Sequence, residues 1–159
     1  MTSQFLQLLW AAVAITFPSA SLCAQPDHVV HRAASQSTFT RSENLPACVV
    51  RSIQDGDPKT GPAVILLRFQ RGCVVPWHWH TPNERLIILR GTFQSEMKDS
   101  SAVVLHAGDF FKLPAKHMHQ VTALTEVELF NIPDAPFDIH YVDAQGKEIP
   151  VGEALLGRQ

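Results

Sequence analysis

The sequence has little surplus charge of either sign. Thirteen Lys and Arg face fifteen Asp and Glu in 159 residues, and the formal net charge is −2. The basic residues are scattered and do not form the stripe that a nucleic-acid-binding surface needs, so we expect no nucleic acid among the partners. Heptads and longer internal repeats are absent as well. A chain of this length fits one domain and leaves no room for a second core.

Long hydrophobic runs are almost absent too. The one extended apolar stretch covers residues 5–17, and it is shorter than the roughly 20 residues of a membrane span. Small residues follow it as far as Ala24, which is typical of a secretory signal. We predict a signal peptide over residues 1–24, cleaved near Ala24, and a periplasmic or secreted product without stable membrane insertion. The alternatives are an uncleaved membrane anchor and a cytosolic amphipathic start.

Cysteine is scarce, with three in the chain. Cys23 leaves with the predicted signal, and the bulky Leu22 before it makes a poor lipid-attachment site, although tethering after export stays open. Cys48 and Cys73 could pair in an oxidising compartment, but the sequence does not place their Cα atoms. Each lies beside apolar residues, which favours two small, unpaired, buried side chains.

Proline and glycine, in contrast, are spread between short runs of Val, Ile and Leu, with 11 and 8 copies. Runs typical of strands recur about every 8 to 12 residues, the spacing of a sandwich or barrel, so we predict an all-β fold. The predicted strands cover residues 47–53, 63–69, 74–80, 84–89, 92–97, 102–105, 109–113, 119–123 and 127–132.

These runs divide the chain into four parts. After the signal peptide at 1–24 comes a polar linker or edge segment at 25–45. The strands then form a barrel over residues 46–143. The remaining residues, 144–159, are predicted to be a tail with one short helix at 152–156.

Two histidines one residue apart, His78 and His80, lie in a run rich in Val and Trp. Side chains alternate along a strand, so both imidazoles share one face, which is a metal-ligand spacing. Past a Thr-Pro-Asn turn, Glu84 opens a further apolar strand. The turn is expected to bring a carboxylate back beside the two imidazoles.

This stretch resembles the first motif of the cupin superfamily. Five positions match it at the required gaps: Gly72, His78, His80, Glu84 and Gly91. The second cupin motif is matched at three positions: Gly108, Pro114 and His119. Two positions depart from it, because Lys116 replaces a glycine and Ala123 an asparagine.

The resemblance implies a double-stranded β-helix, or jelly-roll barrel, with four side chains directed at one divalent metal ion. The implied ligands are His78, His80, Glu84 and His119. The similarity extends from about Leu45 to Asp143, where the flanks resemble a group of small single-domain, type-2-like bacterial cupins with export signals.

Alternation divides residues 74–80 between the two faces of the barrel wall. The predicted inward face carries Val74, Pro76, His78 and His80. The predicted outward face carries Val75, Trp77 and Trp79. Two large aromatic side chains on an outer face need a cover, so we expect a homodimer. The alternative cover is the 25–46 segment of the same chain.

The cavity is predicted to be mostly apolar. Side chains expected to face inward on the neighbouring strands are Leu86, Ile88, Arg90, Val121 and Ala123. Register decides whether the cavity is also lined by Ile65, Leu67, Phe69, Gln94 and Phe130. His117 either faces this cavity, as a donor or an acid/base, or lies on a turn in solvent.

Three neutral imidazoles and a carboxylate suit Fe, Mn, Ni, Cu or Zn better than Ca or Mg, and they leave coordination positions open. We expect an exported metal-dependent enzyme, dioxygenase-like or isomerase-like, acting on a small organic substrate in the barrel. No Ser-His-Asp set or second inward carboxylate is evident, so no catalytic residue is assigned. The alternatives are a non-catalytic module that binds or senses a metal or small ligand, and a barrel with vacant ligands.

Overall fold

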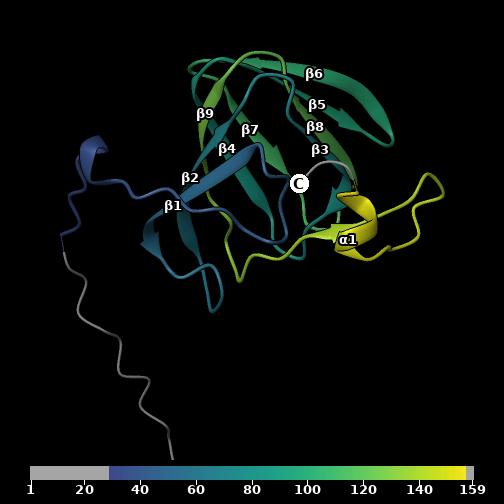
Figure 1. Cartoon of the computed structure of the whole chain (residues 1–159), viewed down its shortest axis with the longest axis horizontal. Coiled ribbons are helices and arrows are strands. Elements are labelled where there is room, and N and C mark those ends of the chain that lie inside the picture. Colours follow the sequence, from purple (N-terminus) through teal and green to yellow (C-terminus); the bar gives the residue numbers. More distant parts are fainter. Residues whose placement is uncertain (1–28, 157–159) are drawn as a thin grey trace, which may run out of the picture.

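The computed structural model describes residues 29–156. The predicted signal peptide and its cleavage site near Ala24 lie outside these residues. Within them the chain forms ten strands and two short helices, and strands dominate the ribbon (Figure 1). The prediction of an all-β fold is confirmed.

In chain order the elements are η1 (Ala34–Gln36), β1 (Val49–Gly56), β2 (Ala63–Phe69), β3 (Val74–Trp79), β4 (Glu84–Arg90), β5 (Thr92–Met97), β6 (Ser100–His106), β7 (Phe110–Leu113), β8 (His119–Ala123), β9 (Val127–Asn131), β10 (His140–Tyr141) and α1 (Val151–Ala154). The predicted bounds of β2, β5 and β8 are confirmed, and the others differ by one to three residues at one or both ends. The two-residue strand β10 was not predicted.

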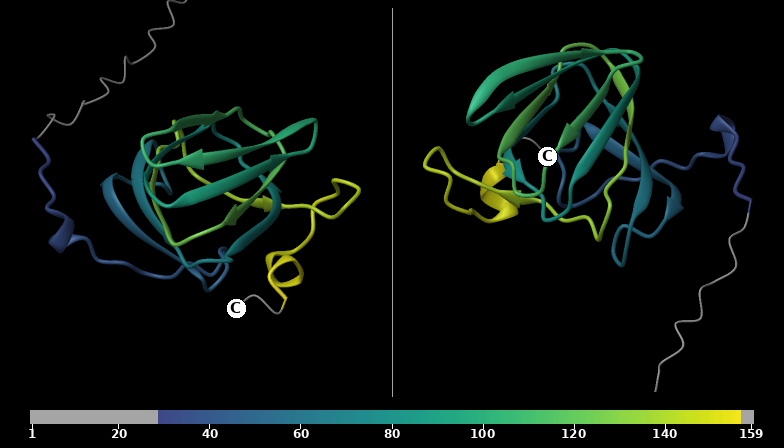
Figure 2. Two further views of the ribbon diagram at one scale, coloured as in Figure 1. Left: turned by 90° about the horizontal axis from the view of Figure 1, so that it is seen from above. Right: turned by 180° about the vertical axis from the view of Figure 1, so that it is seen from behind.

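The strands form two five-stranded sheets, β1-β2-β9-β4-β7 and β10-β3-β8-β5-β6. Most neighbouring strands are distant in the sequence, because the chain passes repeatedly from one sheet to the other. The sheets face each other across a closed interior, which the views from above and from behind show as a rolled wall (Figure 2). This arrangement is a jelly roll.

The core lies between the two sheets. Phe69 of β2 and Phe93 of β5 come from different sheets, and their ring centroids are 5.0 Å apart. Ile65, Ile88 and Leu129 are at most 1% exposed. Burying one such aliphatic side chain contributes roughly 1.5–3 kcal/mol. Packing of the inner faces therefore positions the strands that carry the site.

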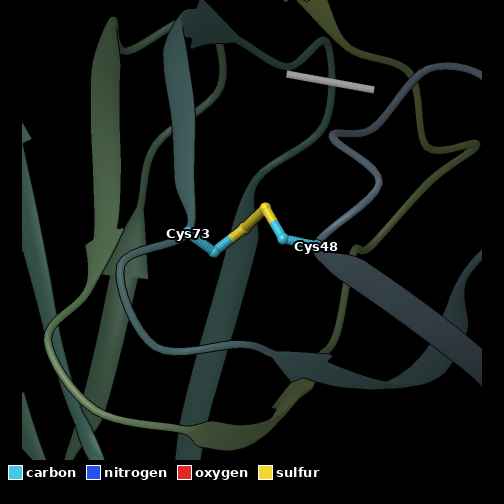
Figure 3. Close-up of a disulfide and its surroundings, with 2 residues drawn as sticks. All are labelled: Cys48 and Cys73. Atoms are coloured by element: carbon cyan, nitrogen blue, oxygen red, sulfur yellow. A yellow bond between two sulfur atoms is a disulfide. The ribbon is translucent and has the colours of Figure 1, made fainter. Parts of the chain in front are cut away.

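Cys48 and Cys73 form a disulfide, with a Cα–Cα distance of 5.7 Å (Figure 3). The expectation of two unpaired cysteines is wrong. The chain reverses at Gly72, whose φ is +79°, and this reversal brings the start of β3 back beside the residue that precedes β1. The bridge joins segments that lead into different sheets.

Two turns near the site contain residues with positive φ angles, Gly91 and Lys116. At Gly91 an added Cβ would lie 2.1 Å from the carbonyl oxygen of Glu126, so only glycine fits there. Lys116, which replaces the second motif's glycine, adopts a φ of +61°. Its N–H donates to the His80 carbonyl oxygen at 2.8 Å. The turn before His119 therefore keeps a left-handed residue without having glycine.

The two tryptophans of β3 are half-buried, and the cover comes from an unexpected part of the chain. The His140 ring stacks on Trp79 at 3.9 Å with the planes 3° apart. Trp77 lines a pocket together with Met118 and Val142, and its carbonyl oxygen accepts a hydrogen bond from the Val142 N–H. Contacts to the two tryptophans therefore come from His140 and Val142 rather than from the described part of the 25–46 segment, which was the alternative to a homodimer.

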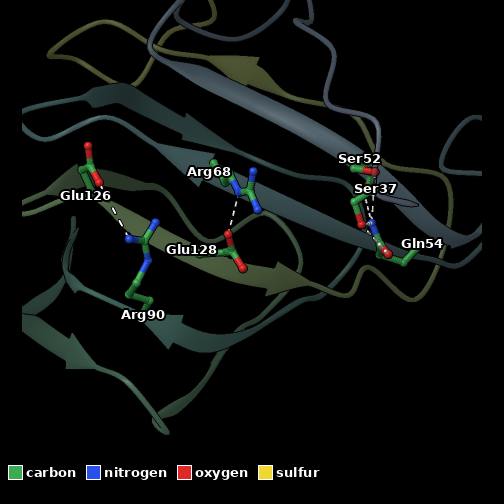
Figure 4. A network of polar contacts seen from close by, with 7 residues as sticks. All are labelled: Ser37, Ser52, Gln54, Arg68, Arg90, Glu126 and Glu128. Atoms are coloured by element: carbon green, nitrogen blue, oxygen red, sulfur yellow. Dashed lines mark hydrogen bonds and ion pairs between the residues drawn. The ribbon is translucent and has the colours of Figure 1, made fainter. Parts of the chain in front are cut away.

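Polar pairs join the strands of the first sheet on its outer side (Figure 4). Arg68 Nε lies 2.5 Å from Glu128 Oε2 across β2 and β9, and such an exposed pair contributes about 0.2–1 kcal/mol. Arg90 pairs with Glu126 at 3.8 Å. The predicted inward orientation of Arg90 is wrong, because the register of β4 against β9 shifts between Ile88 and Arg90.

The two ends of the described chain differ in how they pack. Leu155, which follows α1, is fully buried and belongs to the core. Near the other end, Thr40 pairs with Arg51 along the free edge of β1, while η1 is exposed and lies away from the barrel (Figure 1). Across residues 29–156, no helix has the length and apolar character needed to span a membrane.

Candidate metal centre

Three buried imidazoles from neighbouring strands meet inside the barrel. His78 of β3 and His119 of β8 are directly paired residues, with ring centroids 4.1 Å apart. His80 follows β3, and its ring lies 4.8 Å from that of His78 and 5.4 Å from that of His119. One ligand atom from each residue lies within 4.8 Å of the other two.

The way in which β3 presents its histidines differs from simple alternation. Val75, His78 and His80 face the cavity, and Val74 and Pro76 do not line it. The predicted inward orientation of Val74 and Pro76 is therefore wrong. The β3–β8 register shifts between Val75 and His78, which is a bulge that moves the inward face by one residue.

Each imidazole is fixed by a backbone carbonyl. Nδ1 of His78 donates to the Pro76 oxygen at 2.6 Å, and Nδ1 of His119 donates to the His117 oxygen at 2.9 Å. Nδ1 of His80 donates to the Asp138 oxygen at 2.5 Å. A proton on Nδ1 leaves a lone pair on Nε2, which is the metal-binding tautomer.

Glu84 comes from β4, in the opposite sheet, and faces the imidazoles. Its Oε1 lies 3.7 Å from Nε2 of His80, and its Oε2 lies 3.6 Å from Nε2 of His119. These distances are too long for hydrogen bonds. Two atoms that bind one ion at about 2.1 Å each lie at most about 4.2 Å apart, so both gaps are compatible with a shared ion.

Asn131 of β9 is a site residue that the sequence analysis missed. Its Nδ2 donates to Glu84 Oε1 at 2.5 Å, and the residue is 1% exposed. Its Oδ1 has no hydrogen-bond partner in residues 29–156. A signal existed, because Val127, Leu129 and Asn131 alternate onto one buried face and only the last is polar.

Burial sets the protonation of the four groups. It lowers the pKa of His78 well below the ordinary value, and the neighbouring His119 and His80 act in the same direction. It lowers the pKa of His80 and of His119 to about 4, against the opposing effects of Asp138 and Glu84. Burial raises the pKa of Glu84, against His119 and Asn131. The imidazoles are therefore neutral, as metal ligands must be.

The cavity around these groups is small and mostly apolar, with a volume of about 50 Å³. Ile65, Leu67 and Phe69 line it, and Gln94 and Phe130 do not. Val121 and Leu86 face it as predicted. The sequence analysis missed several further lining residues, including Leu45, Arg51, Phe137 and Ile139. Ala123 is buried but does not line the cavity.

The remaining histidines of interest lie outside this cavity. His117 is half-buried on the turn before β8, and its carbonyl oxygen, not its ring, serves the site. His106 is exposed beside Asp109. His140 lies between Asp138 and Glu148 on the outer side of β3.

The donor set fits a transition metal ion. Three imidazole nitrogens and one carboxylate are borderline-soft donors. Nε2 of His80 is buried without a hydrogen-bond partner among the described residues, and a buried lone pair of that kind is costly unless something binds it. The buried triad of His78, His80 and His119 is thus consistent with metal binding.

Comparison with known proteins agrees with this architecture. Residues 65–133 match the family model described as Cupin domain. This part of the chain therefore resembles a cupin domain, and the two antiparallel sheets have the jelly-roll fold of the small RmlC-like cupins. No curated protein matches the chain.

Several solved structures share the fold. An RmlC-like cupin from Ralstonia eutropha JMP134 is 20% identical with a TM-score of 0.58, and the match covers 74% of each chain. An RmlC-like cupin from Shewanella frigidimarina NCIMB 400 is 19% identical with a TM-score of 0.57, covering 66% of this chain and 88% of that one. Salicylate 1,2-dioxygenase from Pseudoaminobacter salicylatoxidans is 17% identical with a TM-score of 0.50, and the match covers 55% of this chain and 25% of that one. At these identities the likeness concerns the fold.

Proposed function

We propose that this protein binds one divalent transition metal ion through His78, His80, Glu84 and His119, and that it acts on a small organic ligand in the adjoining cavity. The observation that carries the proposal is the common tautomer of the three buried imidazoles: each has Nδ1 bonded to a backbone carbonyl, and Nε2 of His80 and of His119 faces Glu84. Iron, manganese, nickel, copper and zinc all suit this donor set.

An enzymatic role is the first candidate. A metal with four protein ligands keeps open positions and supplies a Lewis acid and a template for a substrate. The chain contributes a cavity that excludes bulk water and fixed ligand orientations. The fold shared with salicylate 1,2-dioxygenase makes an oxidoreductase of the dioxygenase type one option, and an isomerase is the other.

A non-catalytic binding or sensing module is the second candidate, and one observation favours it. Apart from Glu84 and the three histidines, the cavity lining contains one titratable side chain, that of Arg51, among the residues described. No separate base or nucleophile faces the ligand space. Oxygen uptake by the iron-loaded protein with a panel of enols, diols and thiols separates the two roles. Silence across the panel at full metal occupancy would favour the binding module.

Elemental analysis of the full chain, purified without a histidine tag, tests metal binding. We expect about one equivalent of a transition metal per chain, and its loss in His78→Ala and His119→Ala. His106→Ala is the matched control, because His106 is exposed and lies outside the cavity. Unchanged metal content in either ligand variant would contradict the assignment.

We also propose that the protein is exported and processed near Ala24. A disulfide is typical of oxidising compartments, and the Cys48–Cys73 bridge agrees weakly with this location. N-terminal sequencing of protein recovered from cell fractions tests the proposal. An intact Met1 in a cytosolic fraction would exclude it.

Homodimer formation remains our proposal for the oligomeric state. The dimer proposal is supported by Phe110, which is 61% exposed on β7, an edge strand of its sheet. Val104 on the edge strand β6 is 45% exposed. Light scattering should show a dimer that becomes a monomer in Phe110→Ser. Trp77→Ser should have less effect, because Trp77 is half-buried and its strand is paired with residues 140–141 of the same chain.

A further inference from the structure

Arg51 places a cation on the inner face of the barrel. In β1 it pairs with Leu67 of β2, and Ile53, on the same face, pairs with Ile65. Paired residues of antiparallel strands lie on the same side of the sheet. Leu67 and Ile65 line the cavity, and Arg51 lines it with them. The Arg51 side chain therefore belongs to the wall of the ligand space.

The position of Arg51 is at the mouth of that space. A second, outer pocket adjoins the cavity, and four side chains line both: Leu45, Arg51, Phe137 and Ile139. The inner cavity has a volume of about 50 Å³, whereas sites for drug-sized ligands have roughly 300–1,000 Å³. A ligand that fits inside has only a few non-hydrogen atoms, and Arg51 borders both spaces.

Arg51 also lacks a charge partner in the part of the chain that the structure describes. Other strand arginines pair with carboxylates, as Arg68 does with Glu128 and Arg85 with Asp134. The Arg51 backbone bonds to Thr40, and its guanidinium forms no hydrogen bond or ion pair with any residue of 29–156.

The two acidic residues that line these pockets are already engaged. Glu84 accepts a hydrogen bond from Asn131 beside the imidazoles. Asp138 accepts the Thr81 N–H and contacts His140. A partly enclosed guanidinium without a carboxylate is an anion-binding group, since its planar fork matches two oxygens.

We propose that Arg51 binds the anionic head of the cavity's ligand and that this ligand is a small carboxylate. Among the described residues, Arg51 is the one Lys or Arg side chain of the lining. With the head on Arg51, the uncharged end lies among apolar side chains, toward the imidazoles. This inference rests on the function proposed above, for which it names the ligand class.

The test is a titration of the full chain, stripped of metal by a chelator and dialysed, with propionate as the probe. NMR shifts of the Leu67 and Phe137 amides report binding in the cavity. We expect saturable shifts with propionate and an affinity at least about tenfold lower in Arg51→Ala. Propionamide, the neutral isostere, should bind weakly to both proteins. Equal propionate affinity in wild type and Arg51→Ala, or equal binding of propionamide and propionate, would overturn the inference.

Two further variants make the test specific. Arg71→Ala removes the same charge from an exposed turn and should leave propionate binding unchanged. Arg51→Gln keeps a polar side chain if Arg51→Ala does not fold, and it should show the same loss.

Metal content, measured before chelation, separates this inference from the metal proposal. Normal metal with wild-type propionate affinity in Arg51→Ala overturns the inference alone. Propionate binding that depends on Arg51, in a protein that takes up no metal, overturns the metal proposal and supports the anion site.

Discussion

His78, His80 and His119 each donate a hydrogen bond from Nδ1 to a main-chain oxygen. Because Pro76, His117 and Asp138 supply those oxygens through the backbone, ordinary side-chain substitutions at these three positions leave the acceptors in place. The protonated nitrogen is then fixed by the fold, and Nε2 stays free on every ring. The meeting of the three histidines could be predicted from spacing and resemblance, whereas these acceptors could not, since they depend on backbone geometry.

Acidification should destabilise the metal-free protein as the pH falls from about 6.5 to about 4. The pKa of His80 and of His119 is about 4 in the folded chain, below the ordinary 6.5, so the unfolded chain binds protons first in this window. The raised pKa of Glu84 acts in the opposite sense, because the folded chain then binds that proton more readily. Three lowered histidines outweigh one raised glutamate.

Urea unfolding of the metal-free chain at pH 7 and pH 5 measures this effect. The transition midpoint should be lower at pH 5. His80→Gln should show a weaker dependence on pH, because one of the shifted groups is gone. An unchanged midpoint in the wild-type protein would count against neutral, buried imidazoles.

Removal of the Asn131 amide should weaken metal binding. Asn131 is the protein donor that holds Glu84, and losing such a partner typically lowers metal affinity roughly 10- to 100-fold. Competition with a chromophoric chelator would measure the change in Asn131→Ala. Gln94→Ala is the matched control, since Gln94 also donates to a carboxylate, that of Glu96, but does not line the cavity. Similar metal affinities in the two variants would argue against a role of Asn131 in holding Glu84 for the metal.

At the scale of elements, strand positions were easier to predict than strand faces. β2 and β5 are bounded by glycine, proline or polar residues, which predicted their limits correctly. The limits of β8 were also predicted correctly, although apolar residues flank it. The bulge between Val75 and His78 was not predicted, because it depends on pairing with β8. Strand β10 was missed, since a pair of residues shows no periodicity.

Replacement of Lys116 by glycine should stabilise the turn between β7 and β8. A residue with a side chain in the left-handed region costs roughly 1–2 kcal/mol, and the greater freedom of glycine in the unfolded chain takes back about 0.5–1 kcal/mol. The Lys116 ammonium lies 5.9 Å from the Trp79 ring centroid, at the outer limit of such contacts, so its loss should cost little. The free energy of unfolding should stay equal or rise by up to about 1 kcal/mol.

Urea unfolding of Lys116→Gly and Lys112→Gly would compare the turn with a strand. Lys112 is exposed in β7, where the backbone is extended and glycine is unfavourable. Lys112→Gly should therefore be destabilised. Equal destabilisation of the two variants would show that glycine does not relieve backbone strain at position 116.

At the scale of the whole molecule, the Cys48–Cys73 bridge connects the two halves of the barrel. Reduction should lower the free energy of unfolding by about 3 kcal/mol, the typical effect of closing a loop of this size, here a sequence separation of 25. Urea unfolding with and without dithiothreitol measures the loss. A Cys48→Ser/Cys73→Ser variant should have the reduced protein's stability and no response to dithiothreitol. A midpoint unaffected by reduction would contradict a stabilising role.

The segment around Asp138 has a further consequence for the whole molecule. The Asp138 carbonyl holds Nδ1 of His80, the Phe137 ring stacks on the His80 ring at 4.4 Å, and Phe137 and Ile139 border the mouth. A displacement of this segment that widens the mouth also stretches the bond to His80 and frees its ring to rotate. Movement of this segment and reorientation of the His80 ring are therefore expected to be coupled, so that any ion held by His80 would stiffen the segment as well.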